Sequence, residues 1–592
     1  MADLSLQLQA DNFPSDAIEQ LLVEGHWAPI LKRLWTGENL LLEGCRGVGK
    51  TMLMRAAAAR MDAEVRLGGR TLGIHATFKR YLATIPPLGA AESSGLGSFK
   101  AWVNARILDA VKTQVSKTFP DTKDQLPPEI RNVTWSEVIS ILETTYRGNE
   151  PKVQLEMLKK AGLSEASFLG LQGYTYTTNA LQATRSSFGL DLMVLLLDDA
   201  AHALDTRAQG EFFTIVKSLY APGLAFKISV YPAVTRYGLD FSYGHDAVVI
   251  SLGDIPAVNR MNEFVNLLRK RLEVTEAQSP SNSLIQALLR DHQDWIRLMV
   301  YCSNGNPRGL LKLVSQVLTE IGNRDPSLIR YEDIRNATNY VTDRHLDNMI
   351  PGIIKDLDPR LLKASELLLD IFREKIKDAP GPMQGTQPRM FLAITNSMQI
   401  PYLCTAAIKL LVAANVLTSA GAVRLSKREN GTVYLLHPGF VFRDNVLGAG
   451  GRVVTVTADR WLQHFDAMSS RVHAELSKSA SIWDEVKREA NSEPSGRCMN
   501  GHPMMDLTTP CEQCGAVVAP RGPADVLLDK HIDVLELSDG IKQRLLSCGF
   551  DTVRKIFEAR PEDIDAVPYI GGTRVIMIRS AVEAAIDEYF AG

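Results

Sequence analysis

The chain contains 592 residues, which is too long for a single hydrophobic core and predicts about three to five domains. Hydrophobic residues make up 45% and charged residues 22%, as in ordinary soluble globular proteins. The formal net charge is −3, so any contact with nucleic acid has to come from local basic patches. This balance excludes a protein that binds nucleic acid through its overall charge.

The sequence shows no targeting or membrane signal. The apolar run at residues 192–197 is far shorter than a membrane span, and the N-terminus lacks the basic-then-apolar pattern of a secretory signal. Seven cysteines, an odd number, fit a reducing compartment and one metal site better than a disulfide framework. We therefore expect a cytoplasmic protein without membrane contact.

Residues 39–43 form an apolar strand that runs into the pattern G-x-x-x-x-G-K-T, followed by a helix-forming run at residues 52–60. A triphosphate needs glycines for close backbone approach, a helix N-terminus aimed at the anion, a lysine for the β and γ phosphates, and a hydroxyl for Mg²⁺. The pattern therefore predicts a site for ATP and Mg²⁺. The candidate residues are Gly44, Cys45, Arg46, Gly47, Val48, Gly49, the catalytic Lys50, and Thr51 as a magnesium ligand.

A second element supports the first. The apolar run at residues 192–197 is typical of a strand buried on both faces of a parallel sheet, and it ends in Asp198 and Asp199. Ligands bind at this edge of open α/β sheets. We expect Asp198 to orient the Mg²⁺ ion and Asp199 to polarise the attacking water. An aspartate in the second position, one methylene shorter than glutamate, favours slow, switch-like turnover.

The rest of this region reads as alternating strands and helices. We expect strands at residues 70–76 and 225–231 and helices at residues 99–115, 135–146 and 209–219. The second of these strands leads into Thr235 and Arg236, which are candidates for a position beside the γ-phosphate; a surface turn explains both equally well. Arg236 is also a candidate for a finger that acts on a neighbouring subunit.

Residues 303–308 read Ser-Asn-Gly-Asn-Pro-Arg and open a helix, with Pro307 close to its first turn. The order of phosphate loop, paired aspartates and Gly-Asn-Pro-Arg resembles the AAA+ ATPases of the archaeal replication-initiator and origin-recognition class. The resemblance is closest to a bacterial branch found in mobile-element and antiphage-defence settings. It implies a nucleotide-binding core at residues 1–255 and a helical lid at residues 256–350. It also implies that Arg308 senses the γ-phosphate, although a helix-capping turn with a solvated arginine is the alternative.

Residues 355–447 have the order of a winged helix. We expect helices at residues 356–376, 391–398 and 405–414, and short β runs at residues 416–418, 422–426 and 432–437. The Asn430-Gly431 pair predicts a hairpin tip. A small local excess of basic residues makes Lys409, Lys427 and Arg428 candidates for contact with DNA phosphates. Docking of a protein is the alternative for this domain.

After a helical connector at residues 448–490, residues 491–520 carry the spacing Cys498-x₃-His502-x₈-Cys511-x₂-Cys514. Four ligands in two close pairs match closed tetrahedral Zn²⁺ coordination, so the pattern predicts a structural zinc ribbon.

Residues 525–592 read as short helices followed by a long one, and they look like the C-terminal domain of the RNA polymerase alpha subunit and related helix-hairpin-helix folds. Arg574 is a candidate DNA contact, with backbone N–H groups of the hairpin. The segment is acidic overall, which disfavours non-specific DNA binding. Protein docking and DNA binding therefore stay equally open.

Together these patterns predict an α/β fold: a P-loop AAA+ parallel sheet with a helical lid, followed by a winged helix, a zinc ribbon and an all-α helix-hairpin-helix domain. The expected function is an ATP-hydrolysing switch that recognises DNA or a separately encoded effector protein, with an ATP-dependent homo-oligomer as a possible assembly. A slow-turnover DNA-binding initiator and a STAND-type signalling scaffold are the alternatives.

Overall fold

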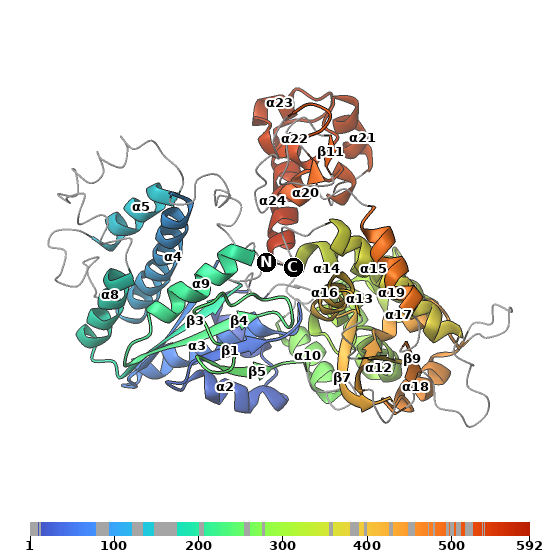
Figure 1. Ribbon diagram of the computed structural model, residues 1–592, viewed down its shortest axis with the longest axis horizontal. Helices are drawn as coiled ribbons and strands as arrows, with labels where there is room; N and C mark the ends of the chain where they lie inside the picture. The colour runs from blue at the N-terminus through green and yellow to red at the C-terminus, as the bar shows by residue number, and fades with distance from the viewer. Residues whose placement is uncertain are drawn as a thin grey trace.

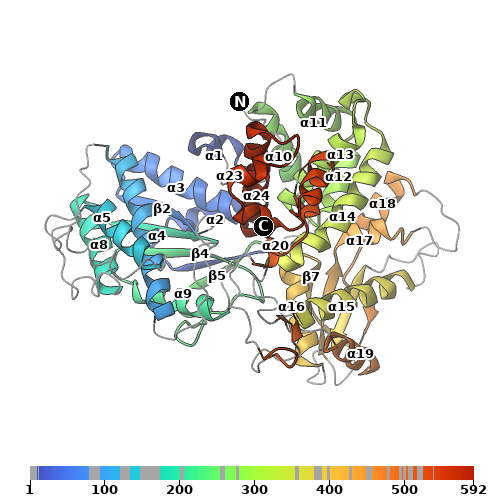
Figure 2. The same ribbon diagram turned by 90° about the horizontal axis from the view of Figure 1, so that it is seen from above.

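The computed structural model of the chain contains a sheet body, a second body rich in helices, and a smaller C-terminal unit (Figure 1). The C-terminal unit, red in Figure 1, lies above the junction of the two larger bodies, and its last helix lies between them when seen from above (Figure 2). The residues described are 10, 13–78, 94–120, 134–146, 174–199, 206–253, 261–274, 279–353, 359–378, 390–395, 400–425, 430–447, 456–471, 473–476, 480–492, 496–497, 502–504, 511–515, 525–535, 537 and 539–591.

The first body is built on a five-stranded sheet in which the described strands are all parallel. The strand order is β2-β3-β4-β1-β5, so β4 lies between the strand before the phosphate loop and the strand that ends in the paired aspartates. Parallel strands end at one edge, so both motifs meet there. The strands are β1 (Leu40–Glu43), β2 (Thr71–Thr77), β3 (Leu192–Asp198), β4 (Leu224–Val230) and β5 (Val248–Ser251).

Side chains of the sheet alternate between two cores, which makes this body a three-layer α/β/α sandwich. In β1, Leu40 and Leu42 belong to the core formed with α1, α2 and α3, whereas Leu41 belongs to the core formed with α4, α5, α8 and α9. The strands and helices expected in this region are confirmed. The helices are α1 (Ser15–Leu21), α2 (Ala28–Leu34), α3 (Lys50–Arg66), α4 (Ser94–Thr118), α5 (Trp135–Tyr146), α8 (Tyr174–Ser187) and α9 (Thr206–Ser218), with the short η2 (Gly25–Trp27) before α2.

A group of helices follows the sheet and packs into a second core. α13 begins after Asn306, whose side chain accepts a hydrogen bond from the backbone N–H of Gly309, and Pro307 occupies its first turn. The helix therefore starts at the place that the sequence predicts. The helices are α10 (Met261–Glu273), α11 (Pro280–Asp291), α12 (Gln293–Cys302), α13 (Pro307–Ile321), η5 (Pro326–Leu328) and α14 (Tyr331–Ile353).

The next part corrects one expectation. Residues 391–398 were expected to be a helix, but residues 391–395 form strand β6, which pairs with β8 on one side and β9 on the other. All five residues of β6 are buried, so the apolar run that looked helical is a central strand, whose two faces are both covered. The described elements are α15 (Pro359–Asp378), β6 (Phe391–Thr395), α16 (Tyr402–Ala413), β7 (Leu417–Arg424), β8 (Asn430–Leu436), α17 (Pro438–Arg443), α18 (Ala458–Asp466), β9 (His473–Glu475) and α19 (Ala480–Ala490).

The expected hairpin is confirmed as β7 and β8, although its two first runs form one strand with an irregularity between Ser419 and Gly421. Because β9, α18 and α19 pack into the same core as β6, the segment expected as a separate connector belongs to this body. The hairpin tip, with Lys427 and Arg428, lies outside the described residues.

The C-terminal unit begins with the short pair β10 (Gly496–Arg497) and β11 (Pro503–Met504). Its helices break at Gly549, which has φ 87°, and restart at Gly572, close to the expected breaks. None of the described helices of the chain is long and apolar enough to cross a bilayer. The helices here are α20 (Asp525–Leu528), η6 (Ile532–Val534), α21 (Asp539–Ser547), α22 (Val553–Glu558), α23 (Pro561–Asp565) and α24 (Gly572–Ala591).

Candidate functional site

The loop between β1 and α3 turns tightly because two of its glycines adopt left-handed backbone conformations. Gly47 has φ 82° and Gly49 has φ 107°, values that residues with a side chain rarely adopt. α3 begins at Lys50, directly after the turn. The N–H groups of a first helical turn have no partner within the helix, so this geometry presents donors to an anion held by the loop.

Lys50 is buried and folds back over this loop. Its Nζ donates hydrogen bonds to the backbone oxygens of Gly44, at 2.6 Å, and Cys45, at 3.2 Å. The same atom lies 4.1 Å from the centre of the Tyr231 ring, which follows β4. The amine is therefore held at the edge where the parallel strands end.

The charge of Lys50 is coupled to both aspartates. The pKa of Lys50 is lowered to about 8 by burial, opposed by the carboxylates of Asp199 and Asp198 and assisted by the nearby Arg308. Burial is the largest of these effects. The lysine, the two carboxylates and the arginine therefore form one electrostatic cluster, as the phosphate-loop pattern and the acidic strand end predict.

The two aspartates are fixed by their neighbours. Asp199 has φ 54°, a left-handed conformation that is uncommon for a residue other than glycine. Its N–H is held by the Ser229 hydroxyl oxygen at 2.9 Å and by Asp198 Oδ1 at 3.1 Å. On the other side, His75 Nε2 lies 3.5 Å from Asp198 Oδ2. Strained backbone of this kind persists where surrounding contacts impose it, often at functional sites.

The start of α13 is docked on the phosphate loop. The Asn306 side-chain amide donates to the backbone oxygen of Arg46, and the Arg308 N–H donates to that of Gly47 at 3.4 Å. A Cβ atom at position 47 would lie 2.5 Å from Asn306 Oδ1. Gly47 is thus required twice, for its backbone conformation and for the close approach of α13.

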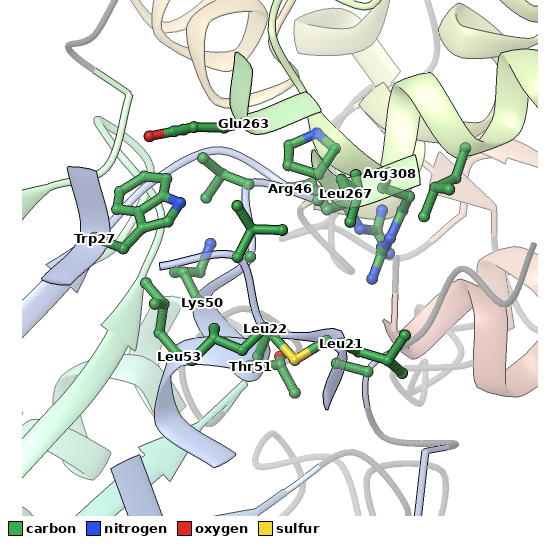
Figure 3. A pocket seen from close by; sticks show the side chains of 18 of the residues that line it. Leu21, Leu22, Trp27, Arg46, Lys50, Thr51, Leu53, Glu263, Leu267 and Arg308 are labelled. Atoms are coloured by element: carbon green, nitrogen blue, oxygen red, sulfur yellow. The ribbon is translucent and has the colours of Figure 1, made fainter. Parts of the chain in front are cut away.

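A pocket extends from Lys50 and Thr51 to an apolar end. Phe13 and Leu22 line that end from the N-terminal segment, and Phe264 lines it from α10. Figure 3 shows Arg46 and Arg308 on one side of the pocket, with Trp27 and Glu263 on the other. A polar, cationic end joined to an apolar end suits a nucleotide, whose phosphates and base have opposite preferences.

Two arginines, Arg271 buried and Arg55 half-buried, secure the N-terminal wall of the pocket. The Arg271 guanidinium lies 4.6 Å from the centre of the Phe13 ring, and burial lowers the pKa of Arg271 to about 10. Arg55 donates to the backbone oxygens of Ala10 and, at 2.9 Å, of Phe13. A segment before the first helix thereby becomes part of the site.

The candidates outside this pocket are placed differently. Arg236 is exposed. The Thr235 hydroxyl donates to the backbone oxygen of Tyr231 at 2.9 Å and accepts from the backbone N–H of the same residue. Lys409 is exposed on α16. Arg574 is exposed at the start of α24, and its guanidinium donates to the backbone oxygen of Tyr569.

Three of the four expected zinc ligands lie together. The ligand atoms of His502, Cys511 and Cys514 all lie within 4.8 Å of one another. Cys498 is outside the described residues. One imidazole nitrogen and two thiolate sulfurs are a donor set that suits Zn²⁺.

Several residues of the site were not predicted from the sequence. Ser229 and Tyr231 lie at the end of β4, which the fold places between the phosphate loop and the paired aspartates. If the sequence had shown this position of β4, the rule that ligands bind at strand ends would have identified both residues. His75 and Arg271 carried no local signal, because β2 and α10 approach the site only through the fold. Asn306 belongs to the motif, but its contact with Arg46 could not be read from it.

No family model matches the chain, and no curated protein matches it. Among solved structures, the chain is similar to that of the Aeropyrum pernix ORC1 protein in complex with DNA, at 14% identity and a TM-score of 0.28, over 74% of this chain and 95% of that one. So low a TM-score assigns neither function nor partner. The strand order and the geometry of the glycine-rich loop make the mixed α/β architecture, with its five-stranded parallel sheet, consistent with a P-loop AAA+ fold.

Proposed function

We propose that the chain binds and hydrolyses ATP as a AAA+ switch. One observation carries the proposal: Lys50, Asp198, Asp199 and Arg308, from three separate segments, form one cluster of interacting charges beside the phosphate loop. A polyanion bound together with a metal cation matches this mixture of donors and carboxylates. The sheet order and the apolar end of the pocket agree with a nucleotide.

Each residue has a defined part in this proposal. The loop N–H groups and Lys50 would bind the phosphates, and the hydroxyl of Thr51 and a carboxylate oxygen of Asp198 would hold Mg²⁺, since magnesium prefers oxygen ligands. A bound Mg²⁺ supplies charge neutralisation of the phosphates. Asp199, fixed by Ser229, would orient and polarise the attacking water, and Arg308 would sense the γ-phosphate from α13.

Steady-state phosphate release by the wild type, Lys50→Ala and Asp199→Asn tests this function. We expect at least about a hundredfold loss of turnover in both variants, because Lys50→Ala removes the amine that holds the phosphates and Asp199→Asn removes the carboxylate that polarises the attacking water. Lys32→Ala is the matched control, since Lys32 is exposed on α2 away from the pocket. Equal phosphate release by all four proteins would overturn the assignment.

The parts after the lid are assigned by the same proposal to recognition. The body with β7 and β8 would act as a winged helix that contacts DNA or a partner through Lys409 and, at the hairpin tip, Lys427 and Arg428. Residues 491–520 would form a structural zinc ribbon, and residues 525–592 a helix-hairpin-helix unit with Arg574 at its hairpin. A cytoplasmic setting in antiphage defence with a separate effector stays a prediction, as do ATP-dependent oligomers, the Arg236 finger, and a STAND-type scaffold.

A slow-turnover DNA-binding initiator is the second candidate. It is favoured by the short side chain of Asp199 and by the exposed position of Lys409 on α16. It predicts binding to duplex DNA that weakens steeply with salt and is reduced by Lys409→Glu. Absence of DNA binding at low salt, together with fast ATP turnover, would exclude this candidate.

A further inference from the structure

The loop between α12 and α13 touches two distant parts of the molecule at once. At one end, the side chain of Asn306 donates to the backbone oxygen of Arg46 in the phosphate loop. At the other end, the side-chain amide of Asn304 donates to Asn415 Oδ1 at 2.9 Å and to the Thr418 hydroxyl oxygen at 2.8 Å. Asn415 lies in the turn between α16 and β7, and Thr418 lies within β7. Asn304 and Asn306, which only Gly305 separates, therefore connect the β7–β8 hairpin to the phosphate loop.

The second contact joins the C-terminal ends of two helices. Asn304 has φ 52° and Asn415 has φ 58°, and each is the left-handed residue that follows a helix, α12 and α16 respectively. In each case the next N–H group, of Gly305 or of Val416, donates to a backbone oxygen of the preceding helix, as is usual at helix ends. The two helix ends therefore fix where both asparagine side chains start, and the side chains meet in a hydrogen bond.

The surroundings of this contact are not fully packed. A small cavity lies beside it, lined by Asn306 and Arg308 on one side and by Asn415 and His437 on the other. Asn415 is 6% exposed, and its Nδ2 has no hydrogen-bond partner among the described residues. A buried donor that has no partner to lose, beside a cavity, lowers the cost of a local shift of this loop.

We propose that Asn306 and Asn304 are positioning residues that couple occupancy of the phosphate loop to the position of the β7–β8 hairpin. A ligand that draws Arg308 toward the loop moves the start of α13, and with it Asn306. Asn304 transmits this movement to Asn415 and the start of β7. This coupling rests on the proposed nucleotide-binding function.

Hydrogen–deuterium exchange of the full chain, with and without a non-hydrolysable ATP analogue and Mg²⁺, tests the coupling. In the wild type, the analogue is expected to change exchange of the amides at residues 415–424 by about fivefold or more, a typical coupling between sites. Asn304→Gly removes the side chain and places glycine at a left-handed helix end, a position that glycine favours, so the variant is expected to fold. Its analogue affinity should stay within about threefold of wild type, while the hairpin response disappears.

Asn445→Gly is the matched control, because Asn445 also has a left-handed backbone, with φ 47°, but lies after α17. It should keep the hairpin response. Thr418→Val, which removes one acceptor from the other side of the contact, should weaken the response independently of any change at position 304.

The outcomes separate the two ideas. A wild-type response that survives unchanged in both Asn304→Gly and Thr418→Val would overturn the coupling. Analogue binding by the wild type without any hairpin response would also overturn it, while leaving the nucleotide-binding function intact. Failure of the wild type to bind the analogue would overturn the proposed function, and the coupling with it.

Discussion

Substitution of Gly47 by alanine tests whether the docking of α13 on the phosphate loop matters for nucleotide binding. The new Cβ would lie 2.5 Å from Asn306 Oδ1 and 2.8 Å from Arg308 Cβ, so the lid has to move away. Asn306 would then lose its hydrogen bond to Arg46, at a cost of about 0.5–1.5 kcal/mol. The left-handed backbone, with φ 82°, adds about 1–2 kcal/mol.

These costs together amount to ~1.5–3.5 kcal/mol, which corresponds to ~10- to 400-fold weaker nucleotide binding if they fall on the closed, liganded state. Fluorescence titration with a labelled ATP analogue measures this loss. Gly68→Ala is the control, because Gly68 has φ 98° but open space around its Cβ position. It shares the backbone strain without the contact, so its melting temperature should fall while its affinity stays unchanged. Equal affinities of the two variants would refute the role given to lid docking.

Three further predictions concern other parts of the chain. Ser229→Ala removes one of the two acceptors of the Asp199 N–H and should lower kcat about three- to tenfold with KM little changed, as stopped-flow phosphate release can measure. Burial lowers the pKa of Lys227 from 10.5 to about 7. Between pH 7 and pH 10.5 the unfolded chain therefore binds more protons than the folded chain. The free energy of unfolding should rise with pH over this range, by at most ~5 kcal/mol. Denaturant titrations at pH 7 and pH 10 should show this rise in the wild type and not in Lys227→Met. Cys514→Ser should release the metal at residues 498–514, so elemental analysis should find zinc in the wild type but not in the variant.

The sequence predicted the parts of the fold whose pattern is local. The phosphate loop and the strand before Asp198 were found because a glycine-rich turn and a doubly buried strand each leave a continuous signature. The strand at residues 391–395 was missed because an apolar run of this length has no distinguishing period when both of its faces are covered. Only its pairing with β8 and β9, which are distant in sequence, decides its conformation.

The same distinction holds within the site. The position of Lys50 and the paired aspartates at one edge of the sheet was predictable, because it follows from their neighbours in the chain. Ser229 and Arg271 were not predictable. Each lies on an element, β4 or α10, whose position in the fold the sequence does not show. Residues that fix the orientation of another group carry no chemistry of their own, so residue type alone does not mark them.

The position of β4 explains why these supporting residues matter. Neighbouring strands are about 4.8 Å apart, so placing β4 between β1 and β3 sets the ends of β1 and β3 about 10 Å apart. The phosphate loop follows β1 and the paired aspartates end β3, so this separation of the strands fixes where the two motifs begin. The end of β4 also supplies the side chains that hold both partners, with Tyr231 against Lys50 and Ser229 against Asp199. One strand therefore sets the width of the site and the orientation of the groups on either side of it.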